Sequence, residues 1–156
     1  MRDIFRQVAT KKNPKTAGRL DDQLCFALYA ATNAITRMYR PLLSELGLTY
    51  PQYLVLLILW EHGSSPVGEI AERLQLATHA ISPITDRLEE AGLVRRRRDD
   101  ADGRVVHVEL TEAGRRLEPS AAAIQDQVRC RTDLDMDDIV RLRAALVELA
   151  GHLGNP

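Results

Sequence analysis

The feature that most constrains this chain is a change in the spacing of its apolar residues near residue 93. Before that point, along 81–91, they recur every three or four residues, which is typical of a helix. After it, along 105–110, valines alternate with polar residues as in a strand. An Asp- and Gly-rich turn sequence separates that segment from a run of four arginines at 95–98. The pattern predicts a β-hairpin directly after a helical region.

Two short helices are predicted before the hairpin. The first begins at Ser65-Pro66, because proline is tolerated in the first turn of a helix. The second follows a break at Leu76-Ala77 and ends at Gly92, since glycine is typical of helix ends. Two short helices joined by a tight turn form a helix-turn-helix. With the hairpin, they predict a winged helix-turn-helix DNA-binding domain over residues 49–110.

The remaining segments also have helical patterns. A capping box of Thr49 and Gln52 opens a central helix that is apolar nearly all round. A helix from 111 to about 131 contains Pro119, which predicts a kink or a late start. Asp135 through Asp138 are expected to cap a final helix. We therefore predict a mainly α fold with a small β-wing.

Helices at both ends of the chain predict a homodimer. Their heptad-like apolar stripes have no obvious use within one chain, so a dimer interface is the natural one. The stripes consist of Leu24, Leu28, Ala31, Ile35, Met38 and Leu42 in the first helix, and Ile139, Leu142, Leu146, Leu149 and Leu153 in the last. We expect a flexible arm at 1–19, dimerisation helices at 20–48 and 111–156, and the winged domain between them.

Composition limits the compartment and the partners. Lys and Arg total 21 against 22 acidic residues, which excludes a protein that is basic all over but leaves room for a local basic patch. Two cysteines are too few for a disulfide-stapled secreted scaffold. No signal-peptide pattern is visible, and the longest apolar run is far shorter than the roughly 20 residues that span a bilayer. We expect a cytoplasmic protein with reduced thiols and no membrane partner.

DNA contacts are expected from the second helix and the wing. A recognition helix presents polar side chains to base edges, and wing cations reach phosphates or the minor groove. The candidates on the helix are Thr78, His79, Ser82, Thr85 and Arg87, and those on the wing are Arg95, Arg96, Arg97, Arg98 and Arg104. Ser65, at a predicted helix N-terminus, is a further phosphate candidate. Two alternatives stay open. The arginine run can be merely a solvated strand, and a winged helix can serve only as a protein-interaction module.

Cys25 lies on a second stripe of the first helix, with Tyr29 and Tyr39. Cys25 and Tyr39 are 14 residues apart, or about 21 Å along a straight helix, so they meet only across an antiparallel dimer. A helix start favours a thiolate, whereas Asp21 and Asp22 oppose one. Spacing alone favours the other interpretation, that Cys25 is a buried small hydrophobe.

Several segments together resemble the MarR family of winged-helix regulators. They include Arg87-Leu88-Glu89, Ala91-Gly92-Leu93-Val94 and Leu110-Thr111-Glu112-Ala113-Gly114. Two others, Leu24-Cys25-Phe26-Ala27-Leu28-Tyr29 and Leu46-Gly47-Leu48-Thr49-Tyr50-Pro51-Gln52-Tyr53, resemble more narrowly the OhrR-type organic hydroperoxide sensors, two-cysteine subtype. The chain differs from the family at Ala77-Thr78-His79-Ala80, and at Asp86, a position that is often basic.

The resemblance implies a redox-sensing repressor that binds a pseudo-palindromic operator when reduced and releases it when an organic hydroperoxide oxidises Cys25. It implies that Cys130 of the partner subunit is the resolving cysteine. Tyr39 and Tyr50 are implied to contact the reactive cysteine across the dimer, and Tyr29, on the same stripe as Cys25, is a further candidate for such a contact. The resemblance also implies a wing-tip pair of Asp102 with Arg104, the arginine reaching toward the minor groove.

Three other functions are weighed against this one. A MarR-type repressor controlled by a small phenolic ligand has the same fold. A thiol peroxidase uses the same cysteine chemistry, but the chain has no thioredoxin-like pattern or Cys-x-x-Cys, and we expect no enzyme. Metal control is not expected, because His62, His79, His107 and His152 show no paired ligand spacing. No cofactor is expected.

Overall fold

The computed structural model describes residues 18–154. They divide into two units, with the boundary between Ala34 and Ile35. In the first unit a single 3₁₀ turn, η1 (Leu20–Asp22), precedes the start of helix α1 (Leu24–Ser44), and none of residues 18–34 is buried. The predicted flexible arm lies almost wholly outside the described residues. No helix of the described part of the chain is long and apolar enough to cross a membrane.

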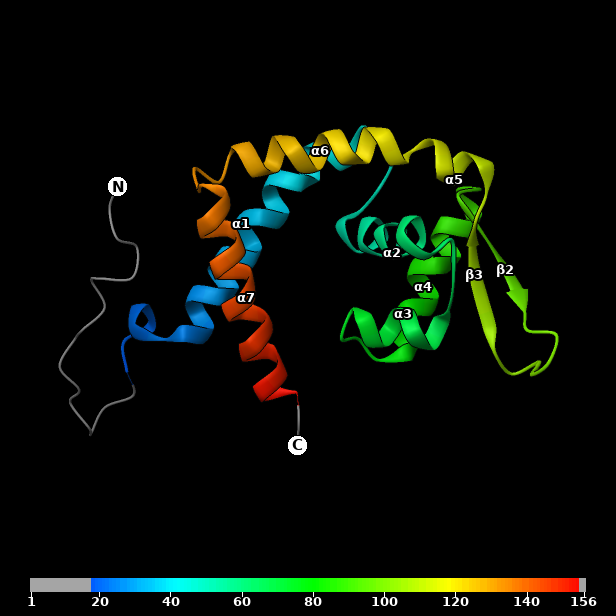
Figure 1. The fold of residues 1–156 in the computed structure, drawn as a ribbon, viewed down its shortest axis with the longest axis horizontal. Coiled ribbons are helices and arrows are strands. Elements are labelled where there is room, and N and C mark those ends of the chain that lie inside the picture. Colours follow the sequence, from blue (N-terminus) through cyan, green and yellow to red (C-terminus); the bar gives the residue numbers. More distant parts are fainter. Residues whose placement is uncertain (1–17, 155–156) are drawn as a thin grey trace. The chain divides into compact units, whose positions relative to one another are not determined.

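The second unit contains the rest of α1 and all later elements (Figure 1). In chain order these are α2 (Tyr50–His62), β1 (Ser64–Pro66), α3 (Val67–Arg73), α4 (Thr78–Glu90), β2 (Val94–Arg98), β3 (Val106–Leu110), α5 (Glu112–Arg116), α6 (Glu118–Cys130) and α7 (Met136–Leu153). The mainly α fold with a small β-wing is confirmed. The helix-turn-helix is α3 followed by α4, and the wing is the hairpin of β2 and β3.

The sheet has a third strand that the sequence pattern did not predict. β1 pairs antiparallel with β3, which also pairs with β2, giving the order β1-β3-β2. The prediction that a helix begins at Ser65-Pro66 is therefore wrong by two residues, because this dipeptide belongs to β1 and α3 starts at Val67. The central β3 residue Val108 faces Ser65 on one side and Arg96 on the other.

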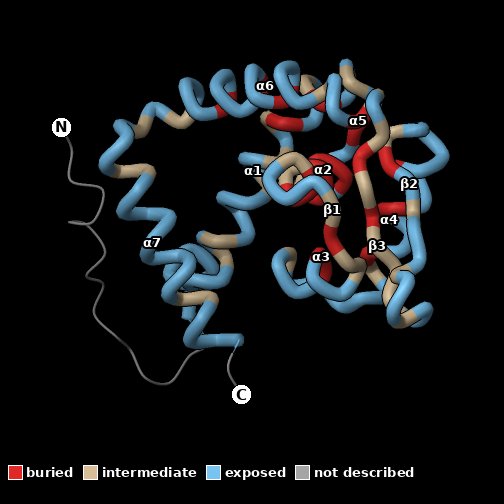
Figure 2. Tube along the Cα trace, turned by 45° about the vertical axis from the view of Figure 1, so that its right-hand side comes forward, coloured by how far each residue is buried: buried red, intermediate tan, exposed pale blue. Residues whose placement is uncertain are grey.

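The core of the second unit is built around α2. Its buried residues include Tyr53, Val55, Leu56 and Leu59, which lie on several sides of the helix, as expected from its apolar sequence. Side chains of the neighbouring elements complete this core, among them Leu43, Ile70, Ile81, Leu88, Val94, Val108 and Leu110. Figure 2 shows the buried positions gathered along α2 and the strands beside it.

Helix boundaries follow the predicted signals. The Oε1 atom of Gln52 accepts hydrogen bonds from the backbone N–H of Thr49 at 2.8 Å and from its hydroxyl at 2.9 Å. Pro119 is the second residue of α6, two residues beyond the break at Leu117, so the late start is confirmed. Asp135 caps α7 by accepting from the backbone N–H of Asp138 at 2.8 Å. In each case a polar side chain or a proline fixes the residue at which the helix begins.

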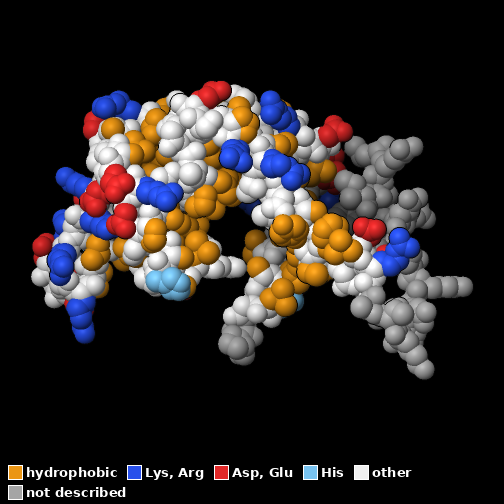
Figure 3. Space-filling model, turned by 180° about the vertical axis from the view of Figure 1, so that it is seen from behind, with side chains coloured by type: hydrophobic (Ala, Val, Ile, Leu, Met, Phe, Trp, Pro, Cys, Tyr) orange, Lys and Arg blue, Asp and Glu red, His pale blue; other side chains and the backbone are white. Residues whose placement is uncertain are grey.

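α7 has no buried residue in this chain. Its exposed large apolar side chains are Met136, Val140, Leu142, Leu146, Val147 and Leu153. Figure 3 shows hydrophobic side chains open to solvent on the face in view. An apolar helix surface of this kind is typical of an interface.

The junction between the wing and α5 is unusually close at Gly114. A Cβ atom on Gly114 would lie 2.1 Å from the carbonyl oxygen of Leu93. The indole Nε1 of Trp60 donates to the Gly114 carbonyl at 3.0 Å, which ties α2 to the same point. Only glycine therefore allows α5 to approach the chain between α4 and β2.

Gly114→Ala is expected to lower the free energy of unfolding by about 3 kcal/mol, because the new methyl group must displace backbone. Gly68→Ala is the control: Gly68 is also helical, and a Cβ there meets nothing within 4 Å. The control should be neutral or more stable by up to about 1 kcal/mol. Urea unfolding of both variants measures the difference, and equal stabilities would contradict the close approach.

Candidate nucleic-acid interface and cysteine site

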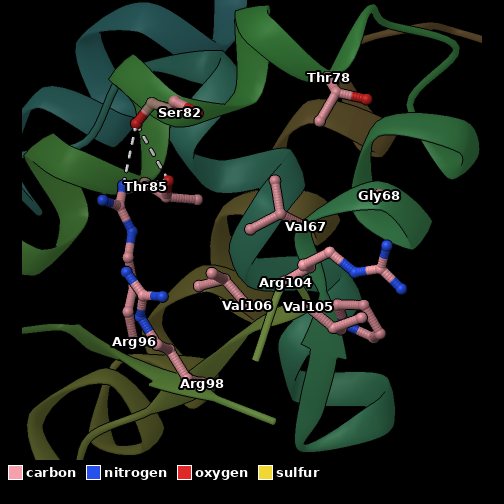
Figure 4. A pocket seen from close by; sticks show the side chains of 11 residues that line it. Val67, Gly68, Thr78, Ser82, Thr85, Arg96, Arg98, Arg104, Val105 and Val106 are labelled. Carbon is pink, nitrogen blue, oxygen red and sulfur yellow. Dashed lines mark hydrogen bonds between the residues drawn. The ribbon is translucent and has the colours of Figure 1, made fainter. Parts of the chain in front are cut away.

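A groove of about 720 Å³ lies between α4 and the wing (Figure 4). Its lining comes from α3 and β1, from α4, and from the hairpin: Pro66, Val67, Gly68, Thr78, Ser82, Thr85, Arg96, Arg98, Arg104, Val105 and Val106. Helix and hairpin residues far apart in sequence thus form one surface that carries three guanidinium groups. Such a basic concave surface suits a polyanion.

The α4 candidates divide by burial. Thr78, His79, Ser82 and Arg87 are exposed. The expectation that Thr85 is exposed is wrong: its side chain is 0% exposed, and its hydroxyl donates to the carbonyls of Ile81 and Ser82 at 3.2 and 3.0 Å. Thr85 faces inward because it lies one turn from the buried Ile81 and Leu88.

Ser65 also departs from its predicted role. It lies in β1 rather than at a helix N-terminus, and it is 1% exposed. Because Ser65 pairs with Val108 in the sheet, its side chain is buried. Ser65 is therefore not placed to meet a phosphate.

Strand alternation divides the arginine run into two faces. Arg95 and Arg97 share one face of β2 with Glu109 of β3, since side chains alternate along a strand. Arg97 Nε donates to the Glu109 carboxylate at 2.9 Å, and Arg95 reaches it at 3.0 Å. These bonds, that of Arg97 foremost, hold the pKa of Glu109 below its ordinary value. Figure 3 shows positive and negative side chains interleaved at its left.

The other face carries Arg96 and Arg98, both of which line the groove. Arg96 contacts α4, whereas the Arg98 guanidinium makes, within residues 18–154, a single hydrogen bond of 3.4 Å to the Gly103 carbonyl. Among the described residues no carboxylate lies within ion-pair distance of Arg98. Arg104, 92% exposed, is paired with Asp102 at 3.1 Å, which joins the two residues of the predicted wing-tip pair.

The wing turn is organised by Asp99, a residue that the sequence analysis did not single out. Its carboxylate accepts from the backbone N–H groups of Ala101 at 2.9 Å and Asp102 at 3.0 Å, and contacts His107 Nε2 at 3.0 Å. The backbone bonds, that of Asp102 foremost, hold the pKa of Asp99 below its ordinary value. An Asp followed by turn residues was the available signal.

Cys25 is the second residue of α1 and carries a free, exposed thiol. The interpretation that it is a buried small hydrophobe is therefore wrong in this chain. Cys130, the last residue of α6, is likewise free and exposed. Tyr29, on α1, is exposed as well. Both thiols are thus open to reagents.

Three tyrosines and a tryptophan form an aromatic cluster in the second unit. The ring centroid of Tyr39 lies 5.1 Å from that of Tyr50 and 5.5 Å from that of Tyr53, and Trp60 lies 6.4 Å from Tyr53. Burial raises the pKa of all three tyrosines, so their phenols are protonated at neutral pH. The structure brings together the predicted Tyr39 and Tyr50 and adds Tyr53.

A second hollow of about 390 Å³ lies beside Tyr50. Arg37 and Arg40 of α1 and Leu48 contribute to its lining. Two guanidinium groups next to an aromatic ring suit a small aromatic anion. No group of three or more metal-ligating side chains occurs among residues 18–154.

Comparison with known proteins decides the family. The MarR pattern matches residues 48–106. The organic hydroperoxide resistance transcriptional regulator of Bacillus subtilis (strain 168) is 40% identical over 131 residues, or 84% of this chain and 89% of that protein. The chain belongs to the MarR family. As a MarR protein it is a transcriptional regulator, and the matched segment runs from just before α2 to the start of β3.

Solved MarR-type structures agree with the fold. The structure of reduced AbfR of Staphylococcus epidermidis bound to DNA matches with a TM-score of 0.72 at 30% identity. The match covers 86% of this chain and 94% of the AbfR chain. Disulfide-formed AbfR has a TM-score of 0.61 at the same identity, covering 86% and 90%. The winged helix-turn-helix fold of this MarR protein is thus shared with regulators of known structure.

The charged form of Asp99 should stabilise the wing turn above the ordinary aspartate pKa of about 3.9. Because the folded-state pKa is lowered, that contribution is lost only as the pH falls through the lower value. The amide proton shift of Ala101, followed by NMR, should titrate with a midpoint below about 3.9. Asp99→Asn should abolish the titration, whereas Asp100→Asn, at a side chain that is 99% exposed, should leave it. A midpoint at or above the ordinary value would refute the assignment.

Proposed function

We propose that this MarR-family regulator is a redox-sensing repressor, which binds operator DNA when Cys25 is reduced and releases it when an organic hydroperoxide oxidises Cys25. One observation carries the proposal: an exposed free thiol at the start of α1, in a chain 40% identical to an organic hydroperoxide resistance regulator. The alternative of a thiol peroxidase has less support, since the relatives are transcriptional regulators.

The chemistry needs two steps. The Cys25 thiolate attacks the outer oxygen of the hydroperoxide, the O–O bond breaks, and a sulfenic acid and an alcohol form. The thiol of Cys130 of the partner subunit then displaces the sulfenic oxygen as water, leaving an intersubunit disulfide. A thiol reductant returns both cysteines to thiols.

Tyrosine hydroxyls assist this chemistry as hydrogen-bond donors. A phenol with the ordinary tyrosine pKa of about 10 is already protonated at neutral pH, and burial raises the pKa of Tyr39 and Tyr50 further, so both can donate to a thiolate or a sulfenate. We place both against Cys25 of the other subunit, with Tyr29 as a further contact. The close approach of the Tyr39 and Tyr50 rings supports a shared target.

DNA binding is assigned to the groove side of the winged domain. The exposed residues of α4, namely Thr78, His79, Ser82 and Arg87, face base edges, and the wing supplies Arg98 and Arg104 to phosphates or the minor groove. Solved structures of AbfR bound to DNA, one reduced and one overoxidized, support DNA as the partner of this fold. Arg95 and Arg97 contribute less, because Glu109 already compensates them.

A homodimer completes the proposal. The unburied apolar residues of α7 supply a surface that a second copy covers, together with α1. Two copies present two α4 helices, which matches a pseudo-palindromic operator. In this scheme residues 20–48 and 111–156 are dimerisation regions and residues 49–110 bind DNA.

A second candidate is a repressor controlled by a small phenolic ligand. The hollow lined by Arg37, Arg40 and Tyr50 favours it, because guanidinium groups bind the carboxylate of an aromatic acid. Such a regulator responds to ligand with no need for a reductant to restore binding.

Cys25→Ser should bind operator as the unaltered protein does, yet lose all response to an organic hydroperoxide, because serine cannot form a sulfenic acid. The probe is a duplex selected by the reduced protein from a random-sequence library. A mobility-shift assay with tert-butyl hydroperoxide, then with dithiothreitol, measures release and recovery. Cys130→Ser should form no linked dimer on a non-reducing gel.

Three outcomes would contradict all or part of the cysteine switch. Peroxide-induced release from Cys25→Ser would assign sensing elsewhere. Release by an aromatic acid alone, unaffected by dithiothreitol, would favour the hollow at Tyr50. Absence of a linked dimer in the unaltered protein after peroxide would exclude the step at Cys130.

Arg98→Ala should weaken operator binding and reduce the slope of log affinity against log salt by about 1, because one phosphate contact releases roughly one counterion. Arg95→Ala is the matched control and should change the slope little, since its guanidinium is already paired with Glu109. Fluorescence anisotropy over 50–300 mM salt measures both. Equal slopes for the two variants would contradict the division of the run into two faces.

A further inference from the structure

Arg96 differs from the other arginines of the wing in what it contacts. Its Nη2 donates to the Ser82 carbonyl at 3.1 Å and to the Thr85 hydroxyl at 2.6 Å, and forms an ion pair with Asp86 (Figure 4). Its backbone N–H donates to Glu89 Oε1 at 2.9 Å, and the same carboxylate lies 3.9 Å from Nε. All of these partners belong to α4.

The partners on α4 form one face of the helix. Ser82, Thr85, Asp86 and Glu89 recur at spacings of three and four, so they span two turns on one side. A guanidinium that contacts three of them fixes both the position and the rotation of α4 relative to β2. The paired groups of the other wing arginines lie within the hairpin itself: Glu109 for Arg95 and Arg97, and Asp102 for Arg104.

Arg96 is also poorly placed for a phosphate. Its side chain is 29% exposed, against 69% for Arg95, and two carboxylates already lie within ion-pair distance. A phosphate would have to displace Asp86 before it gained the guanidinium. Asp86, which stands at a position that is often basic in the family, thus has Arg96 as its partner within the chain.

We propose that Arg96 is a positioning residue, which with Asp86 latches the wing to the recognition helix and holds the groove in its DNA-binding shape. The inference rests on the proposed DNA binding of this surface. The latch sets the spacing between the base-facing residues of α4 and the phosphate-facing Arg98 and Arg104. Preorganisation of this kind raises affinity without adding a contact to the ligand.

The two possible roles of Arg96 predict opposite changes in operator affinity for Asp86→Asn. If Arg96 is a latch, losing its counter-charge loosens the groove and operator affinity falls about threefold to tenfold. If Arg96 is a phosphate ligand, removing a nearby acid frees it, and affinity rises together with the salt slope. Because asparagine keeps the shape of the side chain, this variant also serves should Arg96→Ala unfold the domain.

The experiment measures anisotropy salt slopes on the selected duplex for the unaltered protein, Arg96→Ala, Arg96→Lys and Asp86→Asn. We expect Arg96→Ala to lower affinity about tenfold with an unchanged slope, whereas Arg98→Ala lowers the slope by about 1. Arg96→Lys should not restore affinity, since an ammonium lacks the fork that meets several acceptors. A slope reduced in Arg96→Ala and restored by lysine, or a gain of affinity in Asp86→Asn, overturns the proposal.

Hydrogen exchange separates this proposal from the function on which it rests. Without DNA, Arg96→Ala should raise amide exchange in β2 and β3 by at least tenfold relative to Arg95→Ala. Unchanged exchange overturns the latch whatever the DNA result. Failure of the unaltered protein to select any duplex overturns the proposed function instead.

Discussion

Burial of α2 on several sides is the constraint on which the winged domain depends. This helix contacts α4, β1 and β3, so three of the elements that line the groove rest on one apolar surface. At its C-terminal end, Trp60 bonds the carbonyl of Gly114, and Gly114 in turn lies against the backbone of Leu93. The chain entering the hairpin and the chain leaving it are thereby fixed to the same helix, and only the tip of the wing is left to local interactions.

Those local interactions are mainly electrostatic, and they determine what each wing cation can do. Antiparallel pairing of β2 with β3 places Glu109 between Arg95 and Arg97, while the alternate residues turn toward α4 and the groove. A run of like charges is therefore not one basic patch. It consists of an outer pair that shares the carboxylate of Glu109, an inner residue bound to α4, and one cation at the groove with no carboxylate partner among the described residues.

Much of the fold could be predicted from the sequence because its signals are local. The capping box at Thr49, the break at Pro119 and the cap at Asp135 act within a few residues. β1 could not be predicted, since three residues containing a proline form a strand only where β3 lies beside them. The resolving role proposed for Cys130 rests on the resemblance alone, since no spacing rule links it to Cys25, 105 residues away.

Site residues were less predictable than helices because burial and pairing depend on tertiary structure. Thr85 and Ser65 are ordinary polar residues in sequence, and only packing against the core turns them inward. Tyr53 was not singled out as a site residue, although it completes the cluster with Tyr39 and Tyr50. A strand at 95–98 implies that its arginines point alternately to two faces. That Glu109 pairs with Arg95 and Arg97 depends on the strand register.

The pairing of two guanidinium groups with the single carboxylate of Glu109 has a consequence for a regulator that must find one site on a chromosome. Electrostatic attraction to any duplex grows with each free cation, and bulk DNA competes with the operator in proportion to that attraction. By offsetting one of these two positive charges, the Glu109 side chain lowers the attraction of the wing to irrelevant sequence. Residence on the chromosome at large is thereby shortened, and a greater share of the protein is available for its target.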